Sequence, residues 1–189
     1  MVHEGGEGSQ ERLRIAFAGA GPYAVGALQP ILGSRHQVVA VLQNGRRIRG
    51  LKRRVIPWVS GLVAGETSVT GLARRHGIPA LYIDTMEKAE LEPLAQLQPD
   101  LILVAGFGII LNRSLLELPR LGCLNCHASL LPKHRGPNPF RAVILHNESE
   151  SGVTFHVMTE GIDEGDIVAQ FPFAIDPSDT GGAVYDKAH

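Results

Sequence analysis

Short, almost uninterrupted apolar runs recur along this chain, and stretches suited to helices separate them. The runs cover residues 14–19 (RIAFAG), 37–42 (QVVAVL), 100–106 (DLILVAG) and 122–127 (GCLNCH). We expect helices over residues 23–32, 68–76, 87–97 and 139–145. Strands that read as continuous apolar runs are buried on both faces, as in parallel sheets covered by helices. The pattern predicts an α/β fold with a Rossmann-like, mostly parallel sheet and helices on both faces.

The length of the chain suits one domain. We expect it over residues 13–189, long enough to bury roughly 70% of the surface of the unfolded chain. Residues 1–12 are polar and Gly-rich, and we expect them to form a disordered N-terminal segment. The longest apolar run, LILVAGFGIIL, is too short to span a bilayer, and the N-terminus lacks the apolar core of a signal peptide. A cytoplasmic protein without membrane contact is therefore expected.

A cluster of polar side chains ends the fourth apolar run, in the sequence LNCHASLLPKHRG. Side chains alternate along a strand, so Asn125 and His127 share one face. Both can donate hydrogen bonds, which suits them to hold a carbonyl oxygen that gains charge. A carboxylate follows in the turn EGIDEG, after an alternating strand over residues 153–157. Asp163 in this turn would complete an Asn, His, Asp set, and Asp166 is the alternative acid.

These residues fall in a longer joint pattern. It reads N-x-H-x-S-L-L-P-x-x-R-G over residues 125–136, G-x-T-x-H over 152–156 and I-D-x-G over 162–165. The pattern resembles the folate-dependent formyltransferases, whose members act on methionyl-tRNA, glycinamide ribonucleotide or amino sugars. The resemblance runs from about Leu13 to the C-terminus.

The resemblance implies transfer of a formyl group from 10-formyltetrahydrofolate to a primary amine, without a metal. Asn125, His127 and Asp163 would be the catalytic residues. Imidazolium and amide would stabilise the negative oxygen of the tetrahedral intermediate, and the carboxylate would keep the imidazole protonated and oriented. The folate pocket would be lined by Phe107, Gly108, Ile109 and Ile110, with Glu160, Gly161 and Ile162. Phe107 could instead be core packing. We expect His156 to be a structural strand residue beside the site, with a supporting contact as the alternative.

The amine acceptor has conflicting signals. The segment Arg46 to Arg54, RRIRGLKRR, holds six of the 18 basic residues, in a chain of formal net charge −1. Its place resembles that of a tRNA-contacting loop, although a solvated loop fits equally well. Where tRNA formyltransferases usually read R-G-A-A-P, this chain reads RGPNPF, and it ends at YDKAH, short of their usual C-terminal domain. We therefore expect a small amine, such as an amino sugar or amino acid derivative, with methionyl-tRNA as the alternative.

The turn GAGPYA after the first apolar run has three interpretations. Its Gly19, Gly21, Pro22 and Tyr23 could bind the phosphate or carboxylate of the acceptor through main-chain amides at a helix start. It could equally be a plain strand-to-helix turn. Read as a dinucleotide fingerprint, it lacks the acidic residue expected about 20 positions on, although Arg46 and Arg47 could hold the phosphate of NADP.

Two functions of other classes therefore stay open beside the transferase. They are an NADP-binding oxidoreductase and an inactive formyltransferase-fold binding module. The CxxC formed by Cys123 and Cys126 does not favour a metal or redox site, because a strand would turn the two side chains to opposite faces. We expect two buried, inert thiols.

Overall fold

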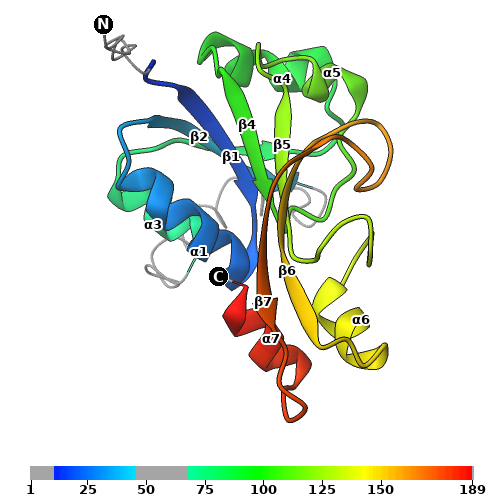
Figure 1. Ribbon diagram of the computed structural model, residues 1–189. Coiled ribbons are helices and arrows are strands. Elements are labelled where there is room, and N and C mark those ends of the chain that lie inside the picture. The colour runs from blue at the N-terminus through cyan, green and yellow to red at the C-terminus, as the bar shows by residue number, and fades with distance from the viewer. Residues whose placement is uncertain (1–10, 46–67, 189) are drawn as a thin grey trace, which may run out of the picture.

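The computed structural model describes residues 11–45 and 68–188. Its centre is a seven-stranded sheet in the order β3-β2-β1-β4-β5-β6-β7 (Figure 1). The strands are β1 Arg14–Gly19, β2 Gln37–Asn44, β3 Ala80–Ile83, β4 Leu101–Ala105, β5 Cys123–His127, β6 Glu150–Val157 and β7 Ile167–Ala174. The helices are α1 Gly21–Leu32, α3 Val69–Arg75, α4 Lys88–Gln96, α5 Arg113–Leu116, α6 Pro139–Leu145 and α7 Gly181–Lys187.

The first five strands are parallel, and the last two are antiparallel additions. β1 lies between β2 and β4, and β5 pairs with β4 on its other edge, all in parallel. β6 and β7 then extend the sheet in antiparallel pairing. The strand order runs from β1 toward β3 on one side and from β4 onward on the other, so it reverses between β1 and β4. Open α/β sheets bind ligands in the crevice at such a point. The expected Rossmann-like, mostly parallel sheet is confirmed.

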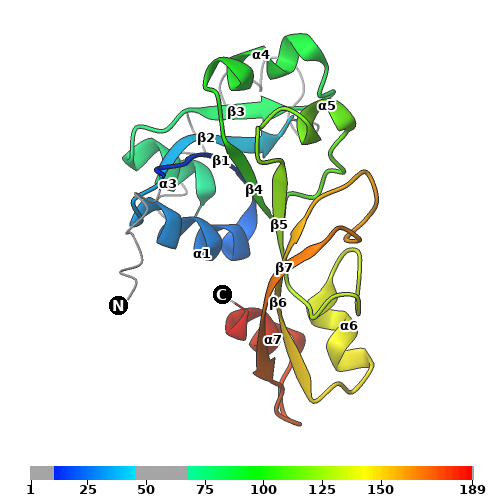
Figure 2. The same ribbon diagram turned by 45° about the horizontal axis from the view of Figure 1, so that its top comes forward.

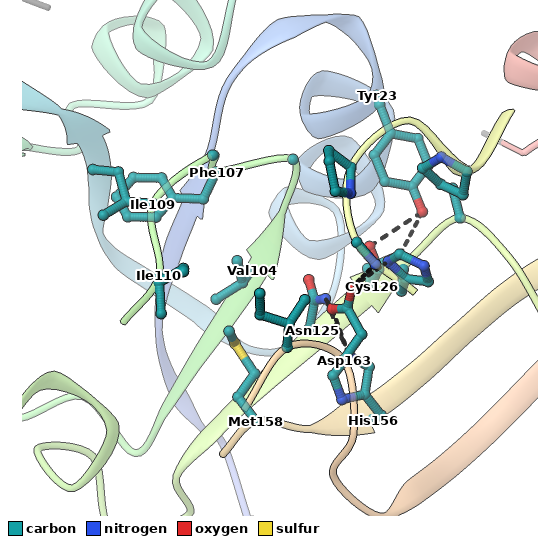
Figure 3. A pocket seen from close by; sticks show the side chains of 18 of the residues that line it. Tyr23, Val104, Phe107, Ile109, Ile110, Asn125, Cys126, His156, Met158 and Asp163 are labelled. Atoms are coloured by element: carbon teal, nitrogen blue, oxygen red, sulfur yellow. Dashed lines mark hydrogen bonds and ion pairs between the residues drawn. The ribbon is translucent and has the colours of Figure 1, made fainter. Parts of the chain in front are cut away.

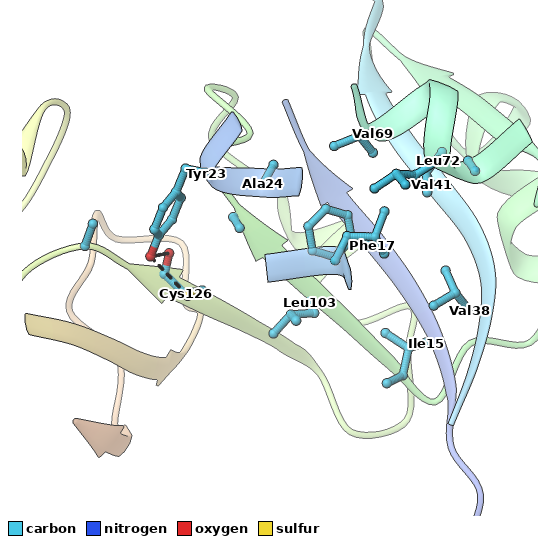
Figure 4. Packing of buried hydrophobic residues seen from close by; sticks show 14 of the residues in the cluster. Ile15, Phe17, Tyr23, Ala24, Val38, Val41, Val69, Leu72, Leu103 and Cys126 are labelled. Carbon is cyan, nitrogen blue, oxygen red and sulfur yellow. Dashed lines mark hydrogen bonds between the residues drawn. The ribbon is translucent and has the colours of Figure 1, made fainter. Parts of the chain in front are cut away.

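Each strand of the sheet's centre contributes alternate side chains to two cores. In β1, Ile15 and Phe17 face one core, whereas Ala16 and Ala18 face the other. Figure 2 shows α1 and α3 on one face of the sheet and α4 and α5 on the opposite face. In the core under α1 and α3, Phe17 is fully buried against neighbours on α3 and β2 (Figure 4). Burial on both faces explains why these strands read as continuous apolar runs.

The elements match the expected pattern closely in the parallel half. β1 and α6 have the expected bounds, and the expected elements of the parallel half differ by one or two residues at their ends. β6 begins three residues before the strand expected over 153–157. We did not expect β3, α5 and α7. β3 and α5 have only four residues each, and α7 begins with two glycines, so all three give weak periodic signals. Within residues 11–45 and 68–188, no helix has the length and apolar character needed to cross a membrane.

Candidate active site

A cavity of about 570 Å³ opens beyond the carboxyl ends of β4 and β5. One arm is apolar and lies beside Phe107, Ile109 and Ile110, whereas the opposite arm lies beside Tyr23 (Figure 3). Asn125 and Asp163 stand between the two arms. The cavity is also lined by Ala20, Val104, Gly106, Gly108, Leu111, Cys126, His127, Ala128, Gly136, Pro137, Asn138, Pro139, Phe140, His156, Met158, Thr159, Gly161, Ile162 and Tyr185. Its volume suits a small organic ligand.

Asn125, His127 and Asp163 converge in this cavity. β5 turns Asn125 and His127 to one face, and the turn between β6 and β7 brings Asp163 over them. The amide Nδ2 of Asn125 donates to Asp163 Oδ1 at 3.1 Å. Nδ1 of His127 lies 3.5 Å from Asp163 Oδ2. The three side chains are thus in direct contact, although Asp163 follows His127 by more than thirty positions.

Each ring nitrogen of His127 faces an acceptor. Nε2 lies 3.0 Å from the main-chain oxygen of His134, and Nδ1 faces the carboxylate of Asp163. A neutral imidazole carries one N–H, so only the doubly protonated ring can donate at both positions. The ring is 8% exposed, and its accessible edge lies on the cavity wall. His127 therefore lies at the cavity wall with both ring nitrogens facing oxygen atoms of the protein.

Asp163 is held as an anion by several donors. Burial opposes its ionisation, but hydrogen bonds from His156 and the Gly136 N–H, with the charges of His127 and His156, keep the pKa of Asp163 below its ordinary value. The Gly136 N–H bond measures 2.9 Å. Asp163 also has a φ of +50°, a left-handed conformation that Asp tolerates better than most residues. Such conformations cluster at functional sites.

His156 is a fourth polar member of the site. It is 1% exposed, and its Nε2 lies 3.1 Å from Asn125 Nδ2 and 3.5 Å from Asp163 Oδ1. Its register opposite Asn125 on β5 follows from the antiparallel pairing of β6. This geometry agrees with the alternative that we gave for His156, a supporting contact, rather than with a purely structural role.

The amide of Asn125 is oriented differently from our expectation. One hydrogen of Nδ2 is donated to Asp163, and the other faces Nε2 of His156, which can accept it when the ring carries its proton on Nδ1 alone. No described residue donates to its Oδ1, and in Figure 3 this oxygen points into the cavity. In this arrangement Asn125 presents an acceptor to a ligand. Donation to a substrate oxygen would require one of the two internal hydrogen bonds to be exchanged.

Most residues expected in a folate pocket line the cavity. Its wall includes six of them: Phe107, Gly108, Ile109, Ile110, Gly161 and Ile162. The seventh, Glu160, is not part of the lining that the described residues form. Phe107 is 4% exposed and also belongs to the core cluster under α4 and α5, so the two interpretations of this residue are compatible. Ile110 and Ile162 are 66% and 53% exposed, at the rim of the apolar arm. Exposed apolar side chains at a cavity mouth suit contact with a ligand.

The expected main-chain anion site at the start of α1 is not formed by all four residues. Only Tyr23 lines the cavity, together with Ala20, whereas Gly19, Gly21 and Pro22 are absent from the described lining. The N–H of Tyr23 donates to the hydroxyl of Tyr185, and Pro22 has no N–H. A Cβ at Gly19 would lie 2.4 Å from the oxygen of Ala105, so this glycine serves close packing of β1. The geometry here supports a plain strand-to-helix turn.

The two cysteines lie on opposite faces of β5. Cys123 packs in the core with α4 and α5, and Cys126 in the core with α1. Burial raises the pKa of Cys123 to about 12. Burial also raises the pKa of Cys126, although a hydrogen bond with Tyr23 acts to lower this pKa.

Within residues 11–45 and 68–188, no group of three or more His, Cys, Asp or Glu side chains could hold a metal ion. Arg46 to Arg54 lie outside the described residues.

Several residues of the cavity escaped sequence-based reasoning. Met158 follows β6 and lines the apolar arm, whereas Phe140 and Tyr185 pack against Tyr23 on the opposite arm. Phe140 and Tyr185 have ring centroids 4.8 Å apart, although 45 positions separate them in the chain. Contacts between α1, α6 and α7 create this wall, and no local pattern predicts them.

The fold and the site together define a Rossmann-like α/β protein with an Asn, His, Asp site at the carboxyl edge of its sheet. The formyl transferase family model matches residues 13–189. The chain therefore belongs to the formyl transferase family.

Similar proteins agree with this membership. A methionyl-tRNA formyltransferase of Pseudomonas fluorescens (strain SBW25) is 40% identical over 178 residues, covering 94% of this chain and 53% of the relative. One of Agathobacter rectalis is 35% identical over 176 residues, covering 93% of this chain and 54% of the relative. The chain thus spans about half the length of these curated relatives.

Solved structures of the family share the fold. Glycinamide ribonucleotide transformylase 1 from Symbiobacterium toebii superposes with a TM-score of 0.73 at 25% identity, covering 97% of this chain and 84% of that one. WlaRD, a sugar 3N-formyl transferase solved with dTDP and 5-N-formyl-THF, superposes with a TM-score of 0.61 at 26% identity. The match covers 94% of this chain and 57% of WlaRD.

Proposed function

We propose that this chain transfers a formyl group from 10-formyltetrahydrofolate to a primary amine. The observation that carries the proposal is the contact of Asn125, His127 and Asp163 between two differently lined arms of one cavity. An acyl transfer between two substrates needs this arrangement, because the donor and the acceptor must meet at one set of polar groups.

The apolar arm fits the pterin end of a reduced folate. Val104, Phe107, Ile109 and Met158 offer flat apolar contact to a ring, and the main chain of residues 106–110 runs beside it. The relative WlaRD was solved with a formylated folate, which supports the same donor class here. Asp163 lies at the inner end of the apolar arm, so the formyl group of a folate bound there would reach Asn125, His127 and Asp163.

The reaction follows from the chemistry of these groups. The amine nitrogen attacks the formyl carbon, the new C–N bond forms, and the carbonyl oxygen gains negative charge. His127 as imidazolium would donate to this oxygen through Nε2, exchanging its bond to the His134 oxygen, while Nδ1 stays opposite Asp163. The oxygen of Asn125 accepts a hydrogen from the attacking amine. The bond to the folate nitrogen then breaks, and the proton lost by the amine returns to that nitrogen through a water held by Asp163.

Methionyl-tRNA is the acceptor that the relatives favour. Curated relatives at 35–40% identity bear this activity in their names, which supports tRNA over the small amine that we expected from RGPNPF. A small amine is the second candidate, because Pro137 and Asn138 of this segment line the cavity. The two solved neighbours named above act, by their names, on a ribonucleotide and a sugar.

A transfer assay with matched acceptors tests the proposal. The protein is incubated with 10-formyltetrahydrofolate and either methionyl-tRNA, glycinamide ribonucleotide or a nucleotide-linked amino sugar, and formylated product is detected by mass spectrometry. With methionyl-tRNA, rates should fall steeply with salt and collapse when Arg46, Arg47, Arg53 and Arg54 become Ala, because phosphate contacts release counterions. With a small amine as acceptor, the transfer rate should depend neither on salt nor on these four substitutions.

Ligand binding separates the remaining alternatives. A ligand that binds only the folded state raises the unfolding midpoint by mass action. Tetrahydrofolate should raise it and NADP should not. A shift with NADP alone would favour the oxidoreductase, whereas a shift with folate and no transfer to any acceptor would favour an inactive binding module.

A further inference from the structure

The turn after β5 contacts both the imidazole and the carboxylate of the site through its main chain. The oxygen of His134 accepts from Nε2 of His127 at 3.0 Å. Two residues later, the N–H of Gly136 donates to Oδ2 of Asp163 at 2.9 Å. The position of this turn therefore sets where both groups stand relative to the cavity.

His134 holds a backbone conformation that few side chains adopt. Its φ is +54°, in the left-handed region that is unfavourable for an L-residue. The side chain is 12% exposed, and Nε2 lies 3.3 Å from Oε1 of Glu148. The ring of His146 packs against it with centroids 5.2 Å apart. The side chain of His134 is thus in contact with two residues, while its main-chain oxygen faces His127.

Glu148 is a firm anchor for this contact. Its N–H donates to the oxygen of Val143 at 3.0 Å, which ties it to the end of α6. Its Oε2 accepts from Nζ of Lys133 at 3.1 Å. The hydrogen bond from Lys133, with a smaller contribution from His134, lowers the pKa of Glu148 despite partial burial. The carboxylate is therefore charged at neutral pH and available to the imidazole.

We propose that His134 and Glu148 form a positioning pair, in which their side-chain contact fixes the main-chain carbonyl that orients His127. Neither side chain lines the cavity as the described residues define it, so the pair acts through His127 rather than on a substrate. The activity readout of this inference rests on the proposed formyl transfer, whereas its spectroscopic readout does not. The pair links the outer surface beside α6 to the reacting imidazole.

Two variants break the pair from opposite sides. His134→Asn removes the imidazole but tolerates the left-handed backbone, and Glu148→Ala removes the carboxylate. In each, kcat should fall roughly tenfold with little change in KM for the folate donor, because misplacing a polar group outside the reacting set typically costs at least this much. Glu148→Gln keeps an acceptor oxygen and should lose less. The double variant should fall no further than His134→Asn alone, because the two residues act as a unit.

The ¹⁵N resonances of the His127 ring give the second readout, assigned through His127→Gln in histidine-labelled protein. They should move in His134→Asn and Glu148→Ala. They should stay unchanged in Glu117→Gln, which makes the same kind of change in the exposed Arg113–Glu117 ion pair, and in Lys133→Ala, which leaves the His134 contact to Glu148 in place.

Unchanged His127 resonances in the folded His134→Asn and Glu148→Ala proteins would overturn the inference, even if the unfolding midpoint fell. Equal resonance changes in Glu117→Gln would do the same. If the wild-type protein formylated no acceptor, the proposed function would fail, and the His127 resonances would still decide whether the pair positions the ring.

Discussion

Gly136 and Asp163 are joined by a hydrogen bond of 2.9 Å from the main-chain N–H of the first to Oδ2 of the second. This bond brings the turn after β5 and the turn between β6 and β7 into contact at the cavity. The carboxylate is thereby held against His127, with Asn125 and His156 on its other oxygen.

Replacing Asp163 by Asn should lower the formyl transfer rate by about 10² to 10³, the usual effect of losing one preorganised electrostatic group. The variant keeps an oxygen but loses the charge that faces His127. Initial rates at saturating donor and acceptor measure the effect. Asp166→Asn is the matched control, because Asp166 is exposed and does not line the described cavity. A loss of rate in Asp166→Asn with normal activity in Asp163→Asn would assign the role to Asp166.

The lowered pKa of Asp163 predicts part of the acid sensitivity of the fold. The folded state binds this proton more weakly than the unfolded state, so the stabilisation is complete above the unfolded pKa of about 3.9. It is lost as pH falls from there through the folded pKa. Urea unfolding from pH 7 down to pH 3 should therefore show a smaller acid loss in Asp163→Asn than in wild type. Identical pH profiles would contradict this account of the carboxylate.

Gly165 should not tolerate a side chain. A Cβ there would lie 1.7 Å from the main-chain oxygen of Val157, so the strand end or the turn must move. We expect Gly165→Ala to lower the free energy of unfolding by about 1–3 kcal/mol and to displace Asp163. In Gly161→Ala the nearest atoms belong to the exposed side chain of Glu164, which can swing away. Thermal unfolding should separate the two variants, and equal losses would show that the turn yields easily.

Both cysteines should resist thiol reagents in the folded protein. The thiolate is the reactive form, and burial raises the pKa of both Cys123 and Cys126. A colorimetric thiol assay at pH 8 should detect no fast-reacting group natively and two after unfolding in denaturant. Rapid labelling of either residue in the native state would indicate that β5 opens to solvent.

Most of the Asn125, His127 and Asp163 site can be predicted from the sequence, because general rules of strand geometry and sheet topology place Asn125 and His127. The alternation of side chains along a strand places Asn125 and His127 on one face, and parallel strands gather their carboxyl ends at one edge. Asp163 needed one further assumption, that the turn after β6 folds back over β5. The antiparallel pairing of β5 with β6 provides this return.

Contacts made by distant helices were not predictable in the same way. The hydroxyl of Tyr185 accepts from the N–H of Tyr23, across 162 positions, and this bond removes a donor that we expected to face an anion. Nothing near either tyrosine in the sequence indicates the contact. The orientation of the Asn125 amide likewise depends on His156 and Asp163 together, and no single motif determines it.

The hairpin of β6 and β7 carries Asp163 at its tip, so the last pair of strands supplies the carboxylate of the site. A nascent or partly folded chain that has formed β1 to β5 contains Asn125 and His127 but lacks the acid, and the reactive set is incomplete until the sheet gains its final edge. Formation of the β6–β7 hairpin would then be the step that completes the reactive set. During synthesis, a ribosome-bound chain would stay inert until residues well beyond position 163 had emerged.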